Sequence, residues 1–568
     1  MATSLPRNAD VADQFDLLAD LLEVEGADHF RVSAYRKAAT RIRETGGSVA
    51  QLALAGKAKD LQGIGKTIEG KIVEIVSDGE IHALSKRKAV IPQDVALFMR
   101  LPGLGPKTAA RIWRELGIET IADLRAAAEQ QRLRGLAGIG AKTEERVLKA
   151  LDASAQDGPV RPLLGDALPA LLAVVSVLRE HPAAEKVSEA GSARRRRETV
   201  RDLDIIATAK DPAALTDYFT KLAWVIEVAA KGDTKATVVS NDGYRFDLRV
   251  VPPESYGNLL QHFTGSKAHN VAIREDAVRR GLSVSEYGVA EVESGAVHTH
   301  ETEEAMYELL GYSFIPPELR ENTGELEAAR LGELPRLVEV EDVRGDLHSH
   351  STWSDGRATL EEIALAAQAR GYEYLAITDH GERLREGRAE AQAEEVAALN
   401  ERLAPFRIVH GVEVGIRADG GLALGDAALE LFEWVIASLH TSFDRNPTER
   451  LLAAIENPRV HCIGHSTARK INIRSGAEID LERVVGRAAE TGTFMEINAQ
   501  PNRLDLRDTH ARLAAEAGVT IPVSTDSHEV SALGHMPLGI SQARRAWLTK
   551  EQVLNTRPWA EIEKLLRR

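Results

Sequence analysis

The sequence of 568 residues contains a single cysteine, Cys462, and no long apolar run. One cysteine excludes a disulfide framework and is typical of a reducing compartment. The polar, acidic N-terminus does not resemble a signal peptide. The most apolar stretch, about residues 167–178, is too short to cross a bilayer and contains Pro169. We therefore expect a protein without membrane segments that is located in the cytoplasm.

Positive charge is outnumbered, because the chain has 71 Lys and Arg against 86 Asp and Glu. The formal net charge is −15, which argues mildly against a nucleic-acid partner. The charge is uneven, however, because residues 1–150 contain 23 Lys and Arg against 20 Asp and Glu, whereas the rest of the chain is acidic. A chain of this length is too long for one core, so several domains are expected, and local motifs must decide what each one binds.

One short pattern occurs three times in the first 150 residues: LQGIGKTIEGKI (61–72), LPGLGPKTAARI (101–112) and LAGIGAKTEERV (136–147). Its glycines allow a tight turn that leaves backbone N–H groups at a helix N-terminus, where a phosphate oxygen binds favourably. A single copy could merely end a helix. Three copies in an almost wholly helical segment resemble helix-hairpin-helix motifs, which hold DNA backbones without reading sequence. The expected DNA contacts are Gly63, Gly65, Lys66, Gly103, Gly105, Lys107, Gly138, Gly140 and Lys142.

After residue 160 short strands are predicted, and three of their residues are aspartates. In DLDIIAT, Asp202 and Asp204 would share one face of a strand. Asp247 lies in YRFDLRV, which Asn-Asp-Gly joins to TKATVVS as a predicted hairpin. Converging carboxylates need divalent cations between them; oxygen ligands suit Mg²⁺, and two ions suit in-line phosphoryl transfer. The alternative is the solvated polar face of an edge strand.

Histidine is concentrated towards the C-terminus, where ten of the 17 histidines follow residue 342. Strands and helices alternate here, and each strand ends in a metal-binding residue type, which predicts a barrel with its site at the strand C-termini. Nine candidate ligands follow the predicted strands: His348, His350, Asp355, His380, Glu413, His440, His465, Asp526 and His528. Structural roles are expected for His410, His461, His510 and His535.

The stretch GSARRRRETVRDLDI (191–205) resembles the GS-x-RR…D-x-D signature of family X DNA polymerases, the polymerase beta group. AYRKAA (34–39), RFDLR (245–249), HFTGSKAHN (262–270) and SEYGV (285–289) resemble further motifs of that family in the same order. This resemblance covers about residues 8–320. It implies an α+β nucleotidyltransferase palm with a C-terminal subdomain, and catalysis with Mg²⁺ or Mn²⁺ held by Asp202, Asp204 and Asp247.

The same resemblance implies further roles for single residues. Contacts to the incoming dNTP are implied for Gly191, Ser192, Arg195, Phe263, Gly265, Asn270 and Arg274. The sequence departs from the family at Arg196 and Arg201, where glycine is usual, and at His262, where tyrosine is common. Lys71 occupies the position of the Schiff-base lysine that removes 5′-deoxyribose phosphate, and Tyr35 matches the same pocket. The alternative for Lys71 is an electrostatic contact to a 5′-phosphate.

The nine residues at strand ends resemble the ligand set of the polymerase-and-histidinol-phosphatase (PHP) domain, across about residues 343–568, whose fold is an irregular (β/α)₇ barrel. The resemblance implies three metal positions: His348, His350, Glu413 and Asp526; Glu413, His440 and His465; and Asp355, His380 and His528. Mixed imidazole and carboxylate ligands suit Mn²⁺, Zn²⁺ or Fe²⁺. Such a site hydrolyses phosphodiesters, which in this family implies a 3′-5′ exonuclease and sometimes cleavage at abasic sites. GHSTARK (464–470) departs from the usual Gly-His-Pro-Thr-Gly-Arg.

These motifs predict a multidomain chain with an all-α N-terminal region, an α+β palm and an α/β barrel. The expected domains are an N-terminal helical DNA-binding domain (1–90), a helix-hairpin-helix domain (91–155), the palm (156–262), a nucleotide-selection subdomain (263–320), a linker (321–342) and the PHP domain (343–568). The leading hypothesis is a monomeric polymerase that fills short gaps in gapped or primer–template DNA and also trims 3′ ends. The alternatives are a PHP-type phosphoesterase with a vestigial polymerase half and a non-enzymatic DNA-binding scaffold.

Overall fold

The computed structural model divides the chain into two compact units. One comprises residues 1–160, 177–187 and 207–251, and the other residues 161–176, 188–206 and 252–568. The structure describes all residues except 1–4, 7, 45–48, 62, 100, 102–103, 137, 157–160, 386, 475 and 567–568. None of the described helices combines the length and apolarity that a bilayer crossing needs.

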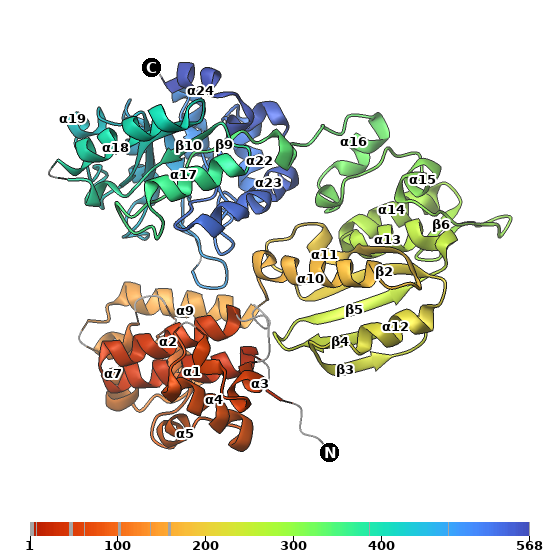
Figure 1. Ribbon diagram of the computed structural model, residues 1–568, viewed down its shortest axis with the longest axis horizontal. Helices are drawn as coiled ribbons and strands as arrows, with labels where there is room; N and C mark the ends of the chain where they lie inside the picture. Colours follow the sequence, from red (N-terminus) through yellow and green to blue (C-terminus); the bar gives the residue numbers. More distant parts are fainter. Residues whose placement is uncertain are drawn as a thin grey trace. The chain divides into compact units, whose positions relative to one another are not determined.

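The N-terminal region is helical, as its composition predicts (Figure 1). Its helices are α1 (Asn8–Glu25), α2 (His29–Glu44), α3 (Val49–Leu54), α4 (Lys66–Asp78), α5 (His82–Lys88), α6 (Asp94–Phe98), α7 (Pro106–Leu116), α8 (Ile121–Glu129) and α9 (Ala141–Gln156). Their apolar residues form one core, in which Phe15, Leu22 and Phe98 are almost completely buried. The core holds the three Gly-x-Gly turns on its periphery, where the second glycine of each described turn is exposed.

A five-stranded sheet follows, with the strand order β1-β2-β5-β4-β3. Its elements are α10 (Leu164–Arg179), β1 (Ala184–Glu189), α11 (Gly191–Arg194), β2 (Asp202–Ala209), α12 (Pro212–Thr220), β3 (Val225–Lys231), β4 (Lys235–Ser240) and β5 (Arg245–Val250). The predicted hairpin is present, because β4 and β5 pair antiparallel with Thr237 opposite Asp247. Gly243 in its turn has φ of 84°, a conformation that favours glycine.

The next segment is a small α+β subdomain. It contains α13 (Tyr256–Thr264), α14 (Lys267–Arg279), β6 (Leu282–Ser285), β7 (Gly288–Glu291), β8 (Val297–His298), α15 (Glu303–Leu309) and α16 (Glu325–Leu331). The segment expected to be an acidic linker, 321–342, therefore contains a helix. Glu325 is completely buried there with its Oε1 2.6 Å from Nδ1 of His269, and Ala329 and Leu337 join the core around Tyr307.

The C-terminal region is a curled parallel sheet with helices packed around it (Figure 1). Its elements are β9 (Gly345–Asp346), α17 (Leu360–Ala369), β10 (Tyr374–Ile377), α18 (Arg388–Leu403), β11 (Arg407–Gly415), α19 (Asp426–Leu429), β12 (Trp434–Ser438), α20 (Pro447–Ile455), β13 (Cys462–Gly464), α21 (Leu481–Thr491), β14 (Phe494–Met495), β15 (Ile497–Asn498), α22 (Asp508–Glu516), β16 (Val523–Ser524), α23 (Met536–Arg545) and α24 (Trp559–Leu566). β9 to β14 pair in chain order, and β15 pairs with β16.

The strands of this region occupy seven positions. Only Glu496 separates β14 from β15, so the two count as one position, and a parallel bridge between Ser349 and Ser527 joins the residues that follow the first and last strands. The strands are buried on both faces, as in YLAI of β10, because helices cover the outside. The arrangement is that of the irregular barrel expected from the sequence.

Candidate active sites

Six of the seven strand positions bring all nine candidate ligands of the C-terminal region to one end of the barrel. His348 and His350 follow β9, His380 follows β10, and Glu413 lies near the end of β11. The remaining ligands follow β12, β13 and β16, except Asp355, which lies in the loop after β9. Parallel strands end at the same edge of a sheet, so side chains separated by up to 180 residues meet there.

Glu413 lies at the centre of the cluster and is 1% exposed. Its Oε1 is 3.0 Å from Nε2 of both His440 and His465. Its Oε2 is 3.0 Å from Nδ1 of His380 and 3.7 Å from Nε2 of both His348 and His350. One carboxylate thus faces two groups of imidazoles with different oxygens, as a bridge between two metal positions requires.

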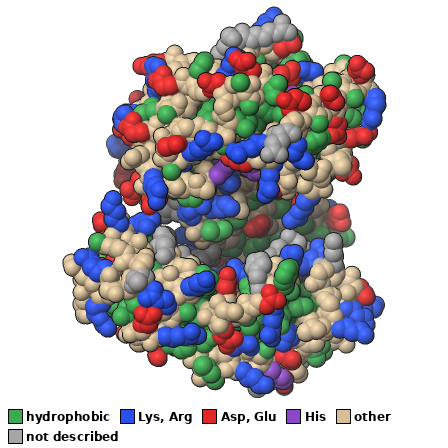
Figure 2. Space-filling model, turned by 90° about the vertical axis from the view of Figure 1, so that its left-hand side faces the viewer, with side chains coloured by type: hydrophobic (Ala, Val, Ile, Leu, Met, Phe, Trp, Pro, Cys, Tyr) green, Lys and Arg blue, Asp and Glu red, His purple; other side chains and the backbone are tan. Residues whose placement is uncertain are grey.

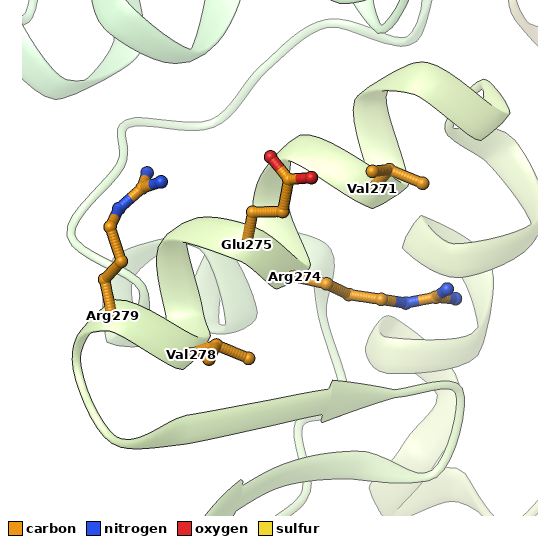
Figure 3. A pocket seen from close by; sticks show the side chains of 5 residues that line it. All are labelled: Val271, Arg274, Glu275, Val278 and Arg279. Carbon is orange, nitrogen blue, oxygen red and sulfur yellow. The ribbon is translucent and has the colours of Figure 1, made fainter.

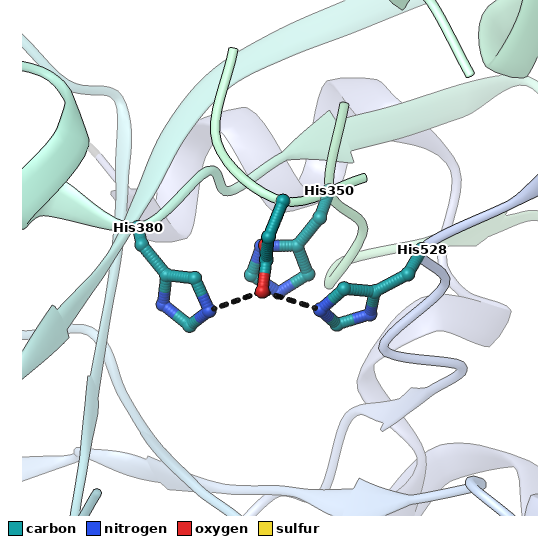
Figure 4. A group of neighbouring side chains, drawn as sticks. His350, His380 and His528 are labelled. Atoms are coloured by element: carbon teal, nitrogen blue, oxygen red, sulfur yellow. Dashed lines mark ion pairs between the residues drawn. The ribbon is translucent and has the colours of Figure 1, made fainter. Parts of the chain in front are cut away.

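Asp526 and Asp355 complete the cluster. Oδ1 of Asp526 lies 3.7 Å from Nε2 of His348 and 3.2 Å from Nε2 of His350. Oδ2 of Asp355 lies 3.5 Å from Nε2 of both His380 and His528, and Figure 4 shows His350, His380 and His528 converging on one point. The contacts form one continuous cluster, because His380 lies close to both Asp355 and Glu413 and His528 also lies 3.6 Å from Asp526. The division into three metal positions stays a prediction.

The donor set fits divalent cations. Nε2 of His348 and both ring nitrogens of His350 are buried without a hydrogen-bond partner among the described residues, and a buried polar atom without a partner is costly unless an ion or water meets it. Burial disfavours the imidazolium of His380, yet Asp355 and Glu413 outweigh this effect and raise its pKa to about 10. The negative charge of Asp355 and Glu413 that favours a proton on His380 also favours a bound cation.

Two residues of the cluster have an unfavourable backbone conformation. His465 has φ of 27° and Asp526 has φ of 51°, the left-handed region that side chains other than glycine rarely adopt. Such strain costs about 1–3 kcal/mol per residue and persists where the surrounding structure fixes it. Its concentration at two candidate ligands supports a functional role for this edge of the barrel.

Glu496 is a site residue that the sequence motifs did not identify. Its Oε1 accepts a hydrogen bond from Nδ1 of His348 at 2.7 Å, which directs Nε2 of that ring towards Glu413 and Asp526. Its Oε2 accepts from the backbone N–H of His465 at 2.9 Å. One carboxylate therefore orients candidate ligands on two strands. The available signal was a charged residue inside the apolar strand FMEINA.

Replacing Glu496 with glutamine is expected to weaken metal binding about 10–100-fold, the usual effect of losing a carboxylate behind a histidine ligand. The measurement is titration of the metal-free protein with Mn²⁺, followed by bound metal per chain. Glu482→Gln, on the exposed face of α21, is the control and should bind as the unchanged protein does. Equal affinity of both variants would contradict the role of Glu496.

A pocket of about 470 Å³ opens over the cluster and contains cationic residues. Arg383 and Arg503 line it together with seven of the nine candidate ligands, and Glu413 is one of these seven. Nε of Arg503 is 3.8 Å from Oδ2 of Asp526, and burial, then Arg503 and Arg474, lower the pKa of Lys470. Figure 2 shows histidine side chains at the surface with lysine and arginine side chains near them. Such a pocket is suited to an anionic substrate.

The second candidate site lies in the five-stranded sheet. Asp202 and Asp204 alternate with the buried Leu203 and Ile205 along β2, and β5, which carries Asp247, is the neighbour of β2 in the sheet order. Thr237 Oγ1 donates a hydrogen bond to Asp247 Oδ1. Arg201 Nε donates to Asp202 Oδ2 at 2.8 Å. This arginine, which occupies a position where the family usually has glycine, therefore contacts a predicted metal ligand.

The short helix α11 packs directly against β2. A Cβ atom at Gly191 would lie 2.1 Å from Oδ2 of Asp204, and Gly191 has φ of 64°, so only glycine fits there. Arg196, also at a usual glycine position, has φ of 56° and pairs with Glu189 at 3.3 Å. Arg195 donates to the carbonyl oxygen of Thr264 at 2.7 Å and to Glu321 at 3.0 Å. Ser192, the remaining predicted phosphate contact here, is half-buried on α11.

The predicted nucleotide contacts in the next subdomain lie around the end of α13. Asn270 Nδ2 donates to the carbonyl oxygens of His262 at 2.7 Å and Gly265 at 3.3 Å, and a Cβ at Gly265 would lie 2.4 Å from Oδ1 of Asn270. Asn270 thus fixes the turn that carries Phe263. Arg274 Nη2 is 3.4 Å from Nδ1 of His262. A shallow depression on α14 includes Arg274, together with Val271, Glu275, Val278 and Arg279 (Figure 3).

The glycines of the Gly-x-Gly turns that the structure describes are all exposed. Gly63 and Gly138 have φ of 84° and 92°, and Gly65 and Gly105 are the N-caps of α4 and α7. No atom lies within 4 Å of where a Cβ would stand at Gly63, Gly65, Gly105, Gly138 and Gly140. Positive φ accounts for Gly63 and Gly138, and no packing contact requires glycine at Gly65, Gly105 and Gly140. The lysines after them, Lys66, Lys107 and Lys142, are exposed, and Gly103 lies outside the described residues.

Lys71 and Tyr35 lie on α4 and α2. Lys71 is half-buried, and Tyr35 is 6% exposed with its ring centroid 6.1 Å from that of Phe15. Tyr35 therefore contributes to the helical core.

Four family matches cover most of the chain. A helix-hairpin-helix domain matches residues 6–81, a SAM-like helix-hairpin-helix tandem 95–153, the DNA polymerase beta thumb 259–321 and the PHP domain 346–499.

Curated relatives fall into two groups. The chain is 38% identical over 570 residues to the DNA polymerase/3′-5′ exonuclease PolX of Bacillus subtilis, covering 98% of this chain and 99% of that protein. It is 32% identical over 227 residues to a probable phosphatase of a Thermoanaerobacter species, covering 37% of this chain and 89% of that protein. A probable phosphatase of Syntrophotalea carbinolica is 29% identical over 223 residues, again 37% of this chain.

Proposed function

The chain belongs to the family of the DNA polymerase/3′-5′ exonuclease PolX, and from this premise we propose that it fills short gaps in DNA and trims 3′ ends at a separate metal site. The observation that carries the proposal is the clustering of nine ligand-type residues at strand ends of the C-terminal region, in a chain that aligns with this relative over 98% of its length. Action on DNA would place the protein in the cytoplasm, and we propose that it works as a monomer.

For nucleotide addition, we assign Asp202, Asp204 and Asp247 as ligands of Mg²⁺ or Mn²⁺. Bound cations would supply charge stabilisation for the triphosphate and the leaving pyrophosphate. Residues 191–198 form what we call the nucleotide loop, and Gly191 allows this loop to lie against Asp204. The loop holds the triphosphate of the dNTP through Ser192 and Arg195. Asp247, oriented by Thr237, accepts the proton of the primer 3′-hydroxyl, which attacks the α-phosphate.

Selection of the nucleotide is assigned to the turn after α13. Phe263 and Gly265 would line the sugar, and Asn270 and Arg274 the nascent pair. Asn270 holds the turn by two hydrogen bonds to its carbonyl oxygens, so its first role is to keep Phe263 in place. Template and primer would be held by the three Gly-x-Gly turns, whose exposed lysines face phosphate oxygens. Gly103 and Tyr35 belong to this expected DNA-binding set, and Lys71 is the candidate lyase nucleophile.

For 3′ trimming, we assign the nine residues of the C-terminal cluster to the three metal positions that the family resemblance implies. Mn²⁺, Zn²⁺ or Fe²⁺ would polarise the scissile phosphodiester and lower the pKa of a water molecule. The residues of this chain position the reaction: Glu413 faces imidazoles with both oxygens, Glu496 fixes the ring of His348, and Arg503 at the pocket neutralises a phosphate of the strand. A phosphoesterase with a vestigial polymerase half is not favoured, because the two phosphatase relatives cited above match only 37% of this chain.

Arg503→Ala is expected to raise KM for trimming a single-stranded oligonucleotide about tenfold, because an arginine–phosphate contact contributes roughly 1.5–3 kcal/mol. Bound metal per chain should not change. Arg483→Ala is the control, since Arg483 is 55% exposed and pairs with Glu449 on the surface. Steady-state trimming over a range of oligonucleotide concentrations gives the comparison, and unchanged KM in Arg503→Ala would remove Arg503 from the site.

A further inference from the structure

Two arginines of the PHP region form hydrogen bonds to the nucleotide loop of the polymerase site. This loop comprises residues 191–198, the GSARRRRE stretch that includes the predicted triphosphate contacts. Its last turn is irregular, because Arg196 has φ of 56°. A loop with this conformation needs fixed partners, and two of them belong to the C-terminal barrel.

The first partner is Arg545, at the end of α23. Its Nη1 donates to the backbone carbonyl oxygen of Arg195 at 2.8 Å, although the two residues are 350 positions apart in the chain. Its Nε and Nη2 donate to Asp508 Oδ2 at 3.0 and 2.6 Å, and Nη1 is 3.1 Å from Glu321 Oε1. The Arg545 side chain is only 3% exposed, so its guanidinium is fixed in one orientation.

The second partner is Arg469, which follows the candidate ligand His465 by four residues. Its Nη2 donates to Glu198 Oε2 at 2.7 Å and also to the carbonyl oxygen of Leu504. Arg507 adds a weaker contact to Glu198 at 3.6 Å. The loop is thus held at its middle by Arg545 and at its end by Arg469.

Glu321 connects these contacts to the triphosphate residues. Its Oε1 accepts from Nε of Arg195 at 3.0 Å and from Nη1 of Arg545 at 3.1 Å. Arg545 therefore fixes both the backbone of Arg195 and the carboxylate that orients the guanidinium of Arg195. Charge-assisted contacts of this kind, in a buried position, set geometry within a few tenths of an ångström, on which phosphoryl transfer depends.

We propose that Arg545 and Arg469 are positioning residues for the incoming dNTP: the PHP region supplies part of the scaffold of the polymerase site in addition to its own chemistry. The inference rests on the proposed role of the 191–198 loop in triphosphate binding. It explains why two arginines of the PHP region contact a loop of the polymerase region.

The test is single-nucleotide incorporation on gapped DNA by full-length variants. Arg545→Gln is expected to raise KM for dNTP about tenfold with kcat changed less than threefold, and Arg545→Lys, which keeps one donor, should give an intermediate KM. Mn²⁺-dependent trimming of a single-stranded oligonucleotide should remain within twofold. Arg544→Gln is the matched control, because Arg544 pairs with Glu318 and Glu339, neither of which is in the loop, and its KM should not change.

Glu198→Gln tests the second anchor from the loop side without altering the barrel, and a rise in KM of about threefold is expected. An unchanged KM in both Arg545→Gln and Glu198→Gln would overturn the proposal, as would an equal rise in Arg544→Gln. Arg195→Ala provides the reference for the underlying assignment. If Arg195→Ala leaves KM unchanged, the role of the loop in triphosphate binding fails, a result distinct from failure of the anchors alone.

Discussion

Replacing Asp202 and Asp204 together with asparagine is expected to reduce nucleotide addition at least about a thousandfold, because several kcal/mol of cation-mediated stabilisation are lost and 1.36 kcal/mol corresponds to a factor of ten. Both residues lie on the polar face of β2, with Leu203 and Ile205 in the core. The isosteric change keeps the strand and removes only negative charge. Primer extension on gapped DNA with a single dNTP measures the effect.

The same double variant should trim 3′ ends at an unchanged rate. The trimming residues lie at the ends of β9 to β13 and of β16, which belong to two other sheets, so the change on β2 should leave them in place. Asp211→Asn, at the exposed N-cap of α12, is the control for loss of one carboxylate in the same region. Incorporation that survives in the double variant would show that nucleotide addition takes place elsewhere.

Glu413→Gln is expected to have the largest effect on the second activity. Its carboxylate oxygens lie 3.0 Å from imidazole nitrogens of three residues, His380, His440 and His465, so the change weakens more than one metal position at once. The rate of trimming should fall at least about a thousandfold, because several kcal/mol of cation-mediated stabilisation are lost and each 1.36 kcal/mol corresponds to a factor of about ten. Nucleotide addition should be unaffected.

The amount of metal bound per chain shows whether the loss of trimming in Glu413→Gln results from weaker metal binding. Metal analysis after dialysis should show fewer ions per chain in Glu413→Gln, whereas Glu433→Gln, at the surface contact with Arg407, should retain them. His440→Ala combined with His465→Ala removes two partners of Glu413 Oε1 and should also abolish trimming. Trimming that persists in both variants would assign the nuclease to another site or to a contaminant.

The sequence predicted the candidate ligands because their pattern is local. Alternation along a strand places Asp202 and Asp204 on one face whatever the rest of the fold, and parallel strands collect their last residues at one edge. Strand ends alone therefore indicated that these residues lie close together, whereas the division into metal positions came from the family resemblance. The helical N-terminal region and the hairpin of β4 and β5 were predictable for the same reason.

What the sequence did not predict depends on contacts between distant residues. Glu496 acquires its role from His348, 148 positions away, and Arg545 from Arg195, 350 positions away. The segment 321–342 was interpreted as a linker from its acidic composition, but Glu325 is completely buried, with its Oε1 2.6 Å from Nδ1 of His269. The charge and composition of a segment indicate how exposed it is on average. They do not show which charged side chains are buried with a partner from a distant part of the chain.

The most direct test of two independent active sites in one chain is a single assay on a gapped, 5′-phosphorylated primer–template with Mn²⁺, with and without dNTPs. The unchanged protein should extend the primer when dNTPs are present and shorten it when they are absent. Asp202→Asn with Asp204→Asn should only shorten it, and Glu413→Gln should only extend it. Loss of both activities in either variant, with the fold intact, would contradict the account.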